Sequence, residues 1–348
     1  MLDDLQKIHE RDPQDALGVT QKQWQQVEHQ YDFGGWQPTA EIHNVVHSGM
    51  GGSALWALLS QSWPGWKVPF EVVRGYDVPA YTGTNTLFIA SSYSGNTEET
   101  LSALAQAEER GAQIVIITSR GRLEEIANEK GYLLIKLPMV IPPRYGCFYG
   151  LRGLVQLGEH LGLLAEPDAV SQLAGTAAFI RESMEAWAPT VPTANNVAKQ
   201  FAQEVMGKSV VVYGGPLLFP AAHKWKISFN ENGKNVAWEY AFPEFNHNEF
   251  TGWTVQPEQK PYVVFYLLSS FDNDRIKKRF ELSDKLLSGR WPSPERVEVQ
   301  GETKLQQLLW TVALGDFVSL YTAFLNNVSP IELGDKDIIE RFKKELNS

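Results

Sequence analysis

The chain has 348 residues, of which 43% are hydrophobic and eleven are tryptophan, enough apolar material for two domains with separate cores. A net charge of −10 at pH 7 argues against a general nucleic-acid or acidic-membrane surface, so an anion site would have to be built locally. The single cysteine, Cys147, excludes an internal disulfide. We find no signal peptide and no run that approaches a membrane span, and we therefore expect a cytoplasmic protein.

The first half predicts alternating strands and helices after a polar helical segment at residues 1–35. Short apolar, β-branched runs lie at residues 45–46, 70–73, 87–90, 114–118 and 133–137. The clearest helix between them is Glu98–Glu109. This alternation predicts a parallel sheet covered by helices on both faces, with ligands at the carboxyl ends of its strands.

The second half repeats this order. Helical patterns at residues 151–163 and 166–187 lead to a break at residues 188–193, where the chain reads APTVPT. Further strands are predicted at residues 209–213, 262–268 and 297–299. Further helices are predicted at residues 196–206, 274–287 and 305–325, and another runs through Lys224 toward Phe229. Both halves open with a strand, a glycine turn and a helix, so the chain resembles a duplicated α/β unit.

The stretch Thr86–Thr100 joins an apolar strand to a helix through a hydroxyl-rich turn. Ser92, Ser94 and Thr97 place three hydroxyls within six residues, and the first N–H groups of the helix point into the same turn. Because the helix dipole favours negative charge there, the pattern predicts a phosphate site. The alternative is an ordinary strand-to-helix connection rich in turn-forming residues.

Individual residues in this turn also predict its backbone conformation and the start of the helix. Gly95 allows a positive φ, and Asn96 with Glu99 three residues later is typical of an N-cap and its capping-box partner. We therefore expect Asn96 to cap the helix.

A second strand-turn-helix lies upstream at Asn44–Ala54. Gly49, Gly51 and Gly52 allow close approach of backbone and ligand, and Ser53 adds a hydroxyl. Neither turn has the lysine of a P-loop or the full dinucleotide fingerprint, which favours a small phosphate monoester over a nucleotide.

Two segments of the second half, residues 226–235 and 242–250, are unusually polar. The first carries Glu231, and the second carries His247 between Glu244 and Glu249. By themselves these residue types do not establish a catalytic role, because an isolated histidine is usually structural or exposed. The two flanking carboxylates also suit the first turn of a helix after a proline.

Metal binding has little support in the sequence. His43 and His47 are four residues apart on a predicted strand and its exit, there is no H-E-x-x-H, and Cys147 has no partner cysteine. We expect chemistry without a metal or another cofactor.

Five motifs in order carry a family resemblance: GMGGSA (49–54), SSYSGNTEET (91–100), PPR (142–144), NEN (230–232) and PEFNHNEF (243–250). Together they resemble the bifunctional phosphoglucose/phosphomannose isomerases of the sugar isomerase (SIS) superfamily. The resemblance spans nearly the whole chain.

The resemblance implies an α/β fold of two SIS domains, each a five-stranded parallel sheet flanked by helices, doubly wound and flavodoxin-like. It also implies a homodimer with active sites at domain and subunit contacts. The expected layout is an N-terminal helical segment (1–35), a first SIS domain (36–165), a helical linker (166–194) and a second SIS domain with a C-terminal helix (195–348).

Carried over position by position, the resemblance implies a role for each site residue. The implied phosphate-binding residues are Gly52, Ser53, Ser92, Ser94 and Thr97. Glu231 matches the base of the family, His247 its ring-opening histidine, and Arg144 the cation beside the reacting oxygens.

The family also has a lysine in its C-terminal helix, for which Lys343 and Lys344 compete. Ile339, Phe342 and Leu346 form an apolar stripe that we expect to be buried. Lys343 lies within this stripe, so helix geometry favours Lys343.

The implied function is isomerisation of glucose 6-phosphate and fructose 6-phosphate by ring opening and an enediolate. In the family, a threonine near the sugar is associated with accepting mannose 6-phosphate, and relatives commonly carry Thr-Pro before the last helix. This chain has Ser329–Pro330 there, so the resemblance leaves mannose 6-phosphate open as a further substrate. The alternatives are a non-catalytic sugar-phosphate sensor and an isomerase of another phosphosugar. Glu231, His247 and Arg144 together favour the enzyme, and neither a nucleic acid nor a membrane is an expected partner.

Overall fold

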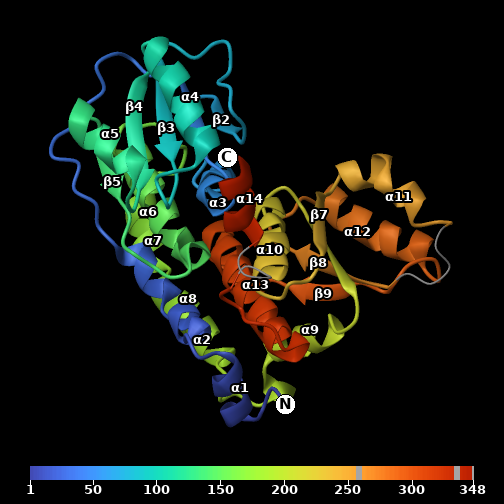
Figure 1. The fold of residues 1–348 in the computed structure, drawn as a ribbon. Coiled ribbons are helices and arrows are strands. Elements are labelled where there is room, and N and C mark those ends of the chain that lie inside the picture. Colours follow the sequence, from blue (N-terminus) through green and yellow to red (C-terminus); the bar gives the residue numbers. More distant parts are fainter. Residues whose placement is uncertain (256–260, 333–337, 347–348) are drawn as a thin grey trace. The chain divides into compact units, whose positions relative to one another are not determined.

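The computed structural model describes residues 1–255, 261–332 and 338–346 (Figure 1). The chain divides into two compact units, which we call the first-sheet unit (residues 23–177) and the second-sheet unit (residues 1–22 and 178–348). The domain boundaries given above stay a prediction, and each unit is described by itself.

The first-sheet unit contains a five-stranded parallel sheet in the order β2-β1-β3-β4-β5. Its strands are β1 (Asn44–Ser48), β2 (Phe70–Val73), β3 (Thr86–Ser91), β4 (Gln113–Thr118) and β5 (Leu133–Lys136). All five apolar runs of the first half thus form strands, as predicted. Both β3 and β4 are buried along their whole length, which explains why they carry no polar alternation.

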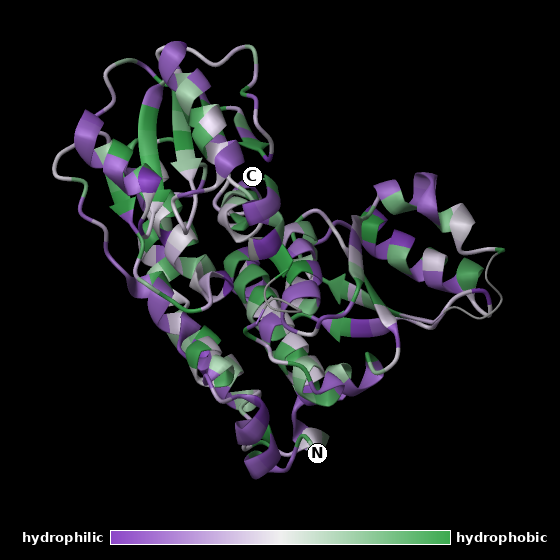
Figure 2. Ribbon diagram, viewed as in Figure 1, coloured by the Kyte–Doolittle hydropathy of each residue, from purple (hydrophilic) through white to green (hydrophobic). Residues whose placement is uncertain are grey.

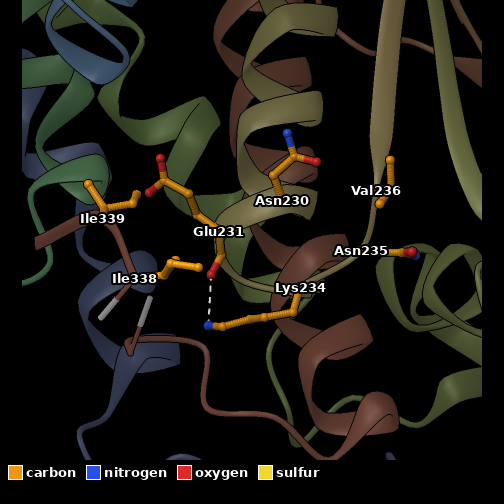
Figure 3. A pocket seen from close by; sticks show the side chains of 7 residues that line it. All are labelled: Asn230, Glu231, Lys234, Asn235, Val236, Ile338 and Ile339. Carbon is orange, nitrogen blue, oxygen red and sulfur yellow. Dashed lines mark hydrogen bonds between the residues drawn. The ribbon is translucent and has the colours of Figure 1, made fainter. Parts of the chain in front are cut away.

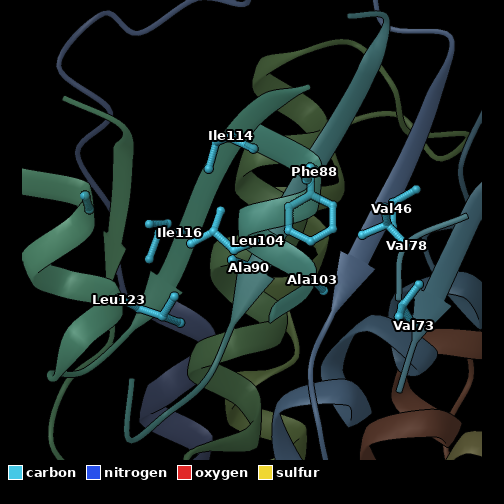
Figure 4. Close-up of a cluster of buried hydrophobic side chains, with 12 residues drawn as sticks. Val46, Val73, Val78, Phe88, Ala90, Ala103, Leu104, Ile114, Ile116 and Leu123 are labelled. Carbon is cyan, nitrogen blue, oxygen red and sulfur yellow. The ribbon is translucent and has the colours of Figure 1, made fainter. Parts of the chain in front are cut away.

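Helices pack on the first sheet through apolar faces. They are α3 (Gly52–Ser62), α4 (Glu98–Glu109), α5 (Arg122–Lys130) and α6 (Cys147–His160). Helix α7 (Ala169–Gly175) packs against α6. One core cluster joins strand residues such as Phe88 and Ile116 to Leu104 of α4 and Leu123 of α5 (Figure 4). This packing holds the start of α4, and with it the hydroxyl-rich turn, against the end of β3.

Helices α3 and α6 meet over a buried tryptophan. A Cβ on Gly150 of α6 would lie 2.3 Å from the Trp56 ring, so the contact requires glycine. The Trp56 indole donates to Nε2 of His47 on β1 at 3.2 Å. Burial lowers the pKa of His47 to about 3, so this imidazole is a neutral acceptor and a core residue.

The second-sheet unit contains a parallel sheet in the order β7-β6-β8-β9. Its strands are β6 (Ser209–Gly214), β7 (Ala237–Ala241), β8 (Tyr262–Leu268) and β9 (Glu295–Glu298). The expectation of five strands is wrong for the described part of this unit, which has four. After β9 the chain turns at Gly301 directly into a long helix, whereas β4 is followed by α5 and β5.

Most helices of the second-sheet unit were predicted, with α12 at the predicted bounds. They are α1 (Leu5–Arg11), α2 (Ala16–Gln21), α8 (Ala177–Ala186), α9 (Val197–Glu204), α10 (Phe219–Glu231), α11 (Glu249–Gly252), α12 (Asp274–Leu287), α13 (Lys304–Asn326) and α14 (Ile338–Leu346). The chain also forms the short 3₁₀ helices η1 (Gln23–Glu28), η2 (Pro143–Gly146), η3 (Thr193–Asn195) and η4 (Glu244–His247). The N-terminal segment is broken between α1 and α2 because Asp12 turns the chain there, accepting from the backbone N–H groups of Ala16 and Leu17.

Helix α13 corrects the expectation that no run is long and apolar enough to cross a membrane. By length and composition it could do so. However, 94% of its most apolar window is buried inside the protein. Figure 2 shows hydrophobic residues concentrated on the strands of the first sheet and on α13, while α12 and α5 carry both colours. We therefore interpret α13 as the core helix of the second-sheet unit.

Candidate functional site

The hydroxyl-rich turn between β3 and α4 brings its three predicted hydroxyls together. Ser92 Oγ lies 2.7 Å from Thr97 Oγ1 and 3.4 Å from Ser94 Oγ. Ser92 is buried, whereas Ser94 and Thr97 are half-buried. The backbone N–H groups of Gly95 and Asn96 point to the same oxygens. The turn therefore groups its hydroxyls directly before the first residue of α4, where the helix dipole favours an anion.

The backbone of this turn is partly as predicted. Gly95 has φ +74°, and a Cβ there would lie 1.7 Å from the Arg120 carbonyl oxygen, so only glycine fits. The predicted capping box is wrong. The N-cap position is Thr97, and Asn96 instead accepts from the backbone N–H of Arg122 at 2.9 Å. Asn96 thus ties the turn to the start of α5 rather than capping α4.

The glycine turn between β1 and α3 lies directly beside the hydroxyl-rich turn. Ser53 Oγ accepts from the backbone N–H of Tyr93 at 3.1 Å, and Ser53 is buried. Nothing lies within 4 Å of the position that a Cβ on Gly52 would take. Open space at Gly52, at the first turn of α3, is what close approach of a ligand to the backbone needs.

Arg144 lies in η2, within a loop held by buried glutamines. Gln23 and Gln26 both donate to the carbonyl oxygen of Tyr145, at 3.2 and 2.7 Å. The Arg144 guanidinium lies 5.4 Å from the centre of the Tyr145 ring and is buried. The loop therefore fixes a buried cation in the first-sheet unit.

Glu231 is the last residue of α10 and lines a cavity of about 380 Å³ (Figure 3). The cavity is also lined by Asn230, Lys234, Asn235, Val236, Ile338 and Ile339. It combines one carboxylate, one lysine, two amides and apolar side chains, and such a mixture of apolar walls and a few polar groups is typical of a small-molecule site.

Helix α10 is fixed along α13 by buried polar contacts. Lys224 Nζ lies 2.5 Å from Asp316 Oδ1 and 2.9 Å from Ser228 Oγ, and Ser228 donates to the same carboxylate. One turn further, Asn232 Nδ2 donates to Ser319 Oγ at 2.9 Å. Because buried ionic groups are stabilised only in well-formed geometry, these contacts set one register of α10 against α13. The position of Glu231 follows from that register.

Lys234 was not identified from the sequence as a candidate site residue. Its Nζ donates to the carbonyl oxygen of Glu231 at 2.8 Å and also to that of Ser329. A cation shortly after a predicted helix end, following Asn-Gly, was the available signal.

His247 ends η4 and is exposed to solvent. The two residues before it are anchored. Phe245 is fully buried in an aromatic cluster, and Asn246 donates to Ser283 Oγ at 2.8 Å and accepts from Arg279 at 3.1 Å. An exposed imidazole on an anchored turn is suited to act on a ligand.

The two carboxylates that flank His247 have partners within their own unit. The hydroxyl of buried Tyr213 donates to Glu249. Burial and the charge of Glu249 raise the pKa of Tyr213 well above its ordinary value, so the hydroxyl keeps its proton. Glu244 accepts from Asn248 Nδ2 at 3.0 Å. Both contacts favour structural roles for Glu244 and Glu249.

The C-terminal helix α14 differs from the expectation. The stripe predicted to be buried is exposed, with exposed fractions of 40% for Ile339, 65% for Phe342 and 55% for Leu346. Lys343 and Lys344 are both exposed, so burial does not distinguish them. The prediction failed because an amphipathic pattern says that a face should be covered but not what covers it. Here only Ile338 and Ile339, among the described residues of α14, border the cavity.

The described residues therefore form two groups. In the first-sheet unit, Ser53, Ser92, Ser94 and Thr97 lie in two adjoining turns. In the second-sheet unit, Glu231 faces a cavity and His247 lies on a separate turn. Within residues 1–255, 261–332 and 338–346, no three histidine, cysteine, aspartate or glutamate side chains are grouped as metal ligands. Metal-free chemistry stays a prediction.

Comparison with known proteins identifies relatives over most of the chain. The family model described as the bacterial phospho-glucose isomerase C-terminal SIS domain matches residues 194–346, and the SIS domain model matches residues 43–136. The bifunctional phosphoglucose/phosphomannose isomerase of Caldicellulosiruptor bescii is 34% identical over 88% of this chain and 91% of its own. The protein of the same name from Aquifex aeolicus is 31% identical over 87% of this chain and 90% of its own.

A solved structure shares the fold. It is described as a glucose-6-phosphate isomerase like protein from Thermus thermophilus, with a TM-score of 0.62 and 18% identity. The similarity covers 99% of this chain and 98% of that one.

Proposed function

Because the chain belongs to the family of bifunctional phosphoglucose/phosphomannose isomerases, we propose that it interconverts glucose 6-phosphate and fructose 6-phosphate. The names of the relatives also support mannose 6-phosphate as a further substrate. The single observation that carries the proposal is the placement of Glu231 at a cavity on a fixed helix end.

The proposed reaction moves one proton between two neighbouring carbons. The Glu231 carboxylate removes the proton from C2 of the open-chain aldose and returns it to C1, while the hydroxyl proton shifts from O2 to O1. The intermediate is an enediolate, whose negative charge is stabilised by a fixed cation. Arg144 is proposed for that role, which its buried position in η2 supports.

Ring opening precedes the proton transfer. It needs a group that can give and take a proton near neutral pH, and an imidazole is the side chain best suited to that. We assign this role to His247, assisted by Lys343. The exposed position of His247 on an anchored turn supports the assignment.

The phosphate is assigned to Ser53, Ser92, Ser94 and Thr97, with Gly52 allowing close backbone approach. The grouping of these hydroxyls at two helix N-termini supports the assignment. Binding energy from this remote group would orient C1 and C2 for reaction.

One coupled assay tests the function. Purified, chelator-treated protein is given glucose 6-phosphate, mannose 6-phosphate and glucosamine 6-phosphate in turn. We expect conversion of the first to fructose 6-phosphate. Turnover of glucosamine 6-phosphate alone would point to another phosphosugar isomerase. Binding of a hexose phosphate without turnover of any substrate would point to a sensor.

We also propose that the chain acts as a cytoplasmic homodimer in which His247 serves the substrate of the partner. Mixing a Glu231→Gln protein with a His247→Ala protein should then restore part of the activity in hybrid dimers. Full activity of a strictly monomeric protein at high dilution would overturn this arrangement.

A further inference from the structure

Lys234 adopts a backbone conformation that lysine rarely takes. Its φ is +49°, in the left-handed region, three residues after the end of α10. Glycine or asparagine is the usual residue at such a position, because a side chain with a Cβ is strained there. Glycine would therefore suit this backbone conformation better than lysine. The presence of a lysine indicates that its side chain has a role.

The Lys234 ammonium holds the end of α10. It donates to the carbonyl oxygen of Glu231 at 2.8 Å, reaches that of Asn232 at 3.5 Å, and donates to that of Ser329. The last carbonyls of a helix lack intrahelical partners and carry the negative end of the helix dipole. A cation that binds two of them keeps the last turn closed and joins it to the segment at Ser329.

The same turn carries the Glu231 side chain. Figure 3 shows the ammonium of Lys234 reaching back to the backbone of Glu231, while the Glu231 carboxylate extends toward Ile339. Lys234 therefore acts on the backbone of Glu231. On the other side of the turn, the side chain of Asn232 is held by Ser319.

We propose that Lys234 is a positioning residue for Glu231, fixing the carbonyl end of α10 so that the carboxylate keeps one orientation in the cavity. This inference rests on the proposed role of Glu231 as the base. Lys234 itself is assigned no contact with the substrate.

The left-handed backbone at Lys234 allows a variant that separates loss of the ammonium group from backbone strain. Lys234→Gly removes the ammonium but relieves the backbone, so it should not lower the melting temperature through strain. Lys234→Arg keeps a donor that can reach carbonyl oxygens. Asn327→Gly is a matched control, because Asn327 is exposed and also has a positive φ, +56°, directly after α13 in the same unit.

We expect Lys234→Gly to lower kcat about 10- to 100-fold with KM changed less than about twofold, because a small misplacement of a reacting group has effects of this size. Lys234→Arg should recover most of kcat, and Asn327→Gly should match the wild type. Amide hydrogen exchange at residues 229–235 should be faster in Lys234→Gly.

The outcomes separate the two proposals. A wild-type protein that isomerises none of the three sugar phosphates overturns the proposed function. A Lys234→Gly protein with wild-type kcat, or with unchanged exchange at residues 229–235, overturns the role of Lys234. A parallel loss of kcat in Asn327→Gly would do the same, because it would trace the effect to backbone relief.

Discussion

Two turns at matching places in the two sheets have opposite chemistry. Each follows the strand that lies third in its sheet order, β3 in one and β8 in the other. The turn after β3 groups hydroxyls, with Ser92 Oγ 2.7 Å from Thr97 Oγ1. The turn after β8 carries Asp272, which is only 6% exposed. A Cβ on Gly215, in the turn after β6, would lie 2.2 Å from its carboxylate.

This difference shows how a duplicated fold assigns different chemistry to its halves. Hydroxyls and N–H groups attract a dianion, whereas a carboxylate pressed against the neighbouring turn repels one and fills the space. Burial raises the pKa of Asp272 to about 6, the sign of a carboxyl group taken out of water. We therefore expect one phosphate site per chain, in the first-sheet unit, with the proposed base in the second-sheet unit.

The largest expected effect concerns the proposed base. Glu231→Gln keeps the shape of the side chain but removes the proton acceptor, and should lower kcat by about 10² to 10⁴. The variant should still bind substrate while exchange of the C2 proton with deuterium from solvent stops. Glu244→Gln is the control. If exchange persists at the wild-type rate in Glu231→Gln and stops in Glu244→Gln, the base is Glu244.

The next effect tests the turn after β3. Ser92→Ala with Thr97→Ala removes two hydroxyls proposed to bind the phosphate, each worth about 1.5 kcal/mol as a hydrogen bond to a charged group. KM for glucose 6-phosphate should rise about 10²-fold. Ser270→Ala removes an exposed hydroxyl from the turn after β8 and should leave KM unchanged. An unchanged KM in the double variant would show that this turn does not bind the phosphate.

Asp272 is expected to affect catalysis least, and its effect should be on the pH dependence of stability. Its folded pKa of about 6 exceeds the ordinary 3.8, so the folded state binds more protons between these values and stability falls as pH rises from about 4 to 6. Asp272→Asn removes this titration. On going from pH 4 to pH 7, the free energy of unfolding of the variant should rise by about 2 to 3 kcal/mol relative to that of the wild type.

Urea unfolding at both pH values measures this gain. Asp274→Asn, at the exposed start of α12, is the control and should show no comparable change. A pH-independent difference between Asp272→Asn and the wild type would show that Asp272 is not a buried, titrating carboxyl group.

Regular elements with strong local patterns were predicted well. Helices α4 and α12 and strand β8 have the predicted bounds. The apolar residues of the two helices keep the helical period, and β8 is a continuous apolar run typical of a buried parallel strand. Strand β7 was missed. It is a short edge strand with Trp238 exposed, so its sequence, AWEYA, shows no buried run.

The sequence by itself determined the parallel sheets, the hydroxyl-rich turn and the family, because these depend on neighbouring residues in a fixed order. Only the tertiary structure decided how the carboxylates differ. Tyr213 reaches Glu249 across 36 residues, and the ammonium of Lys234 reaches Ser329 across 95. Such contacts depend on which strands and helices pack together, and no local spacing of residues encodes them.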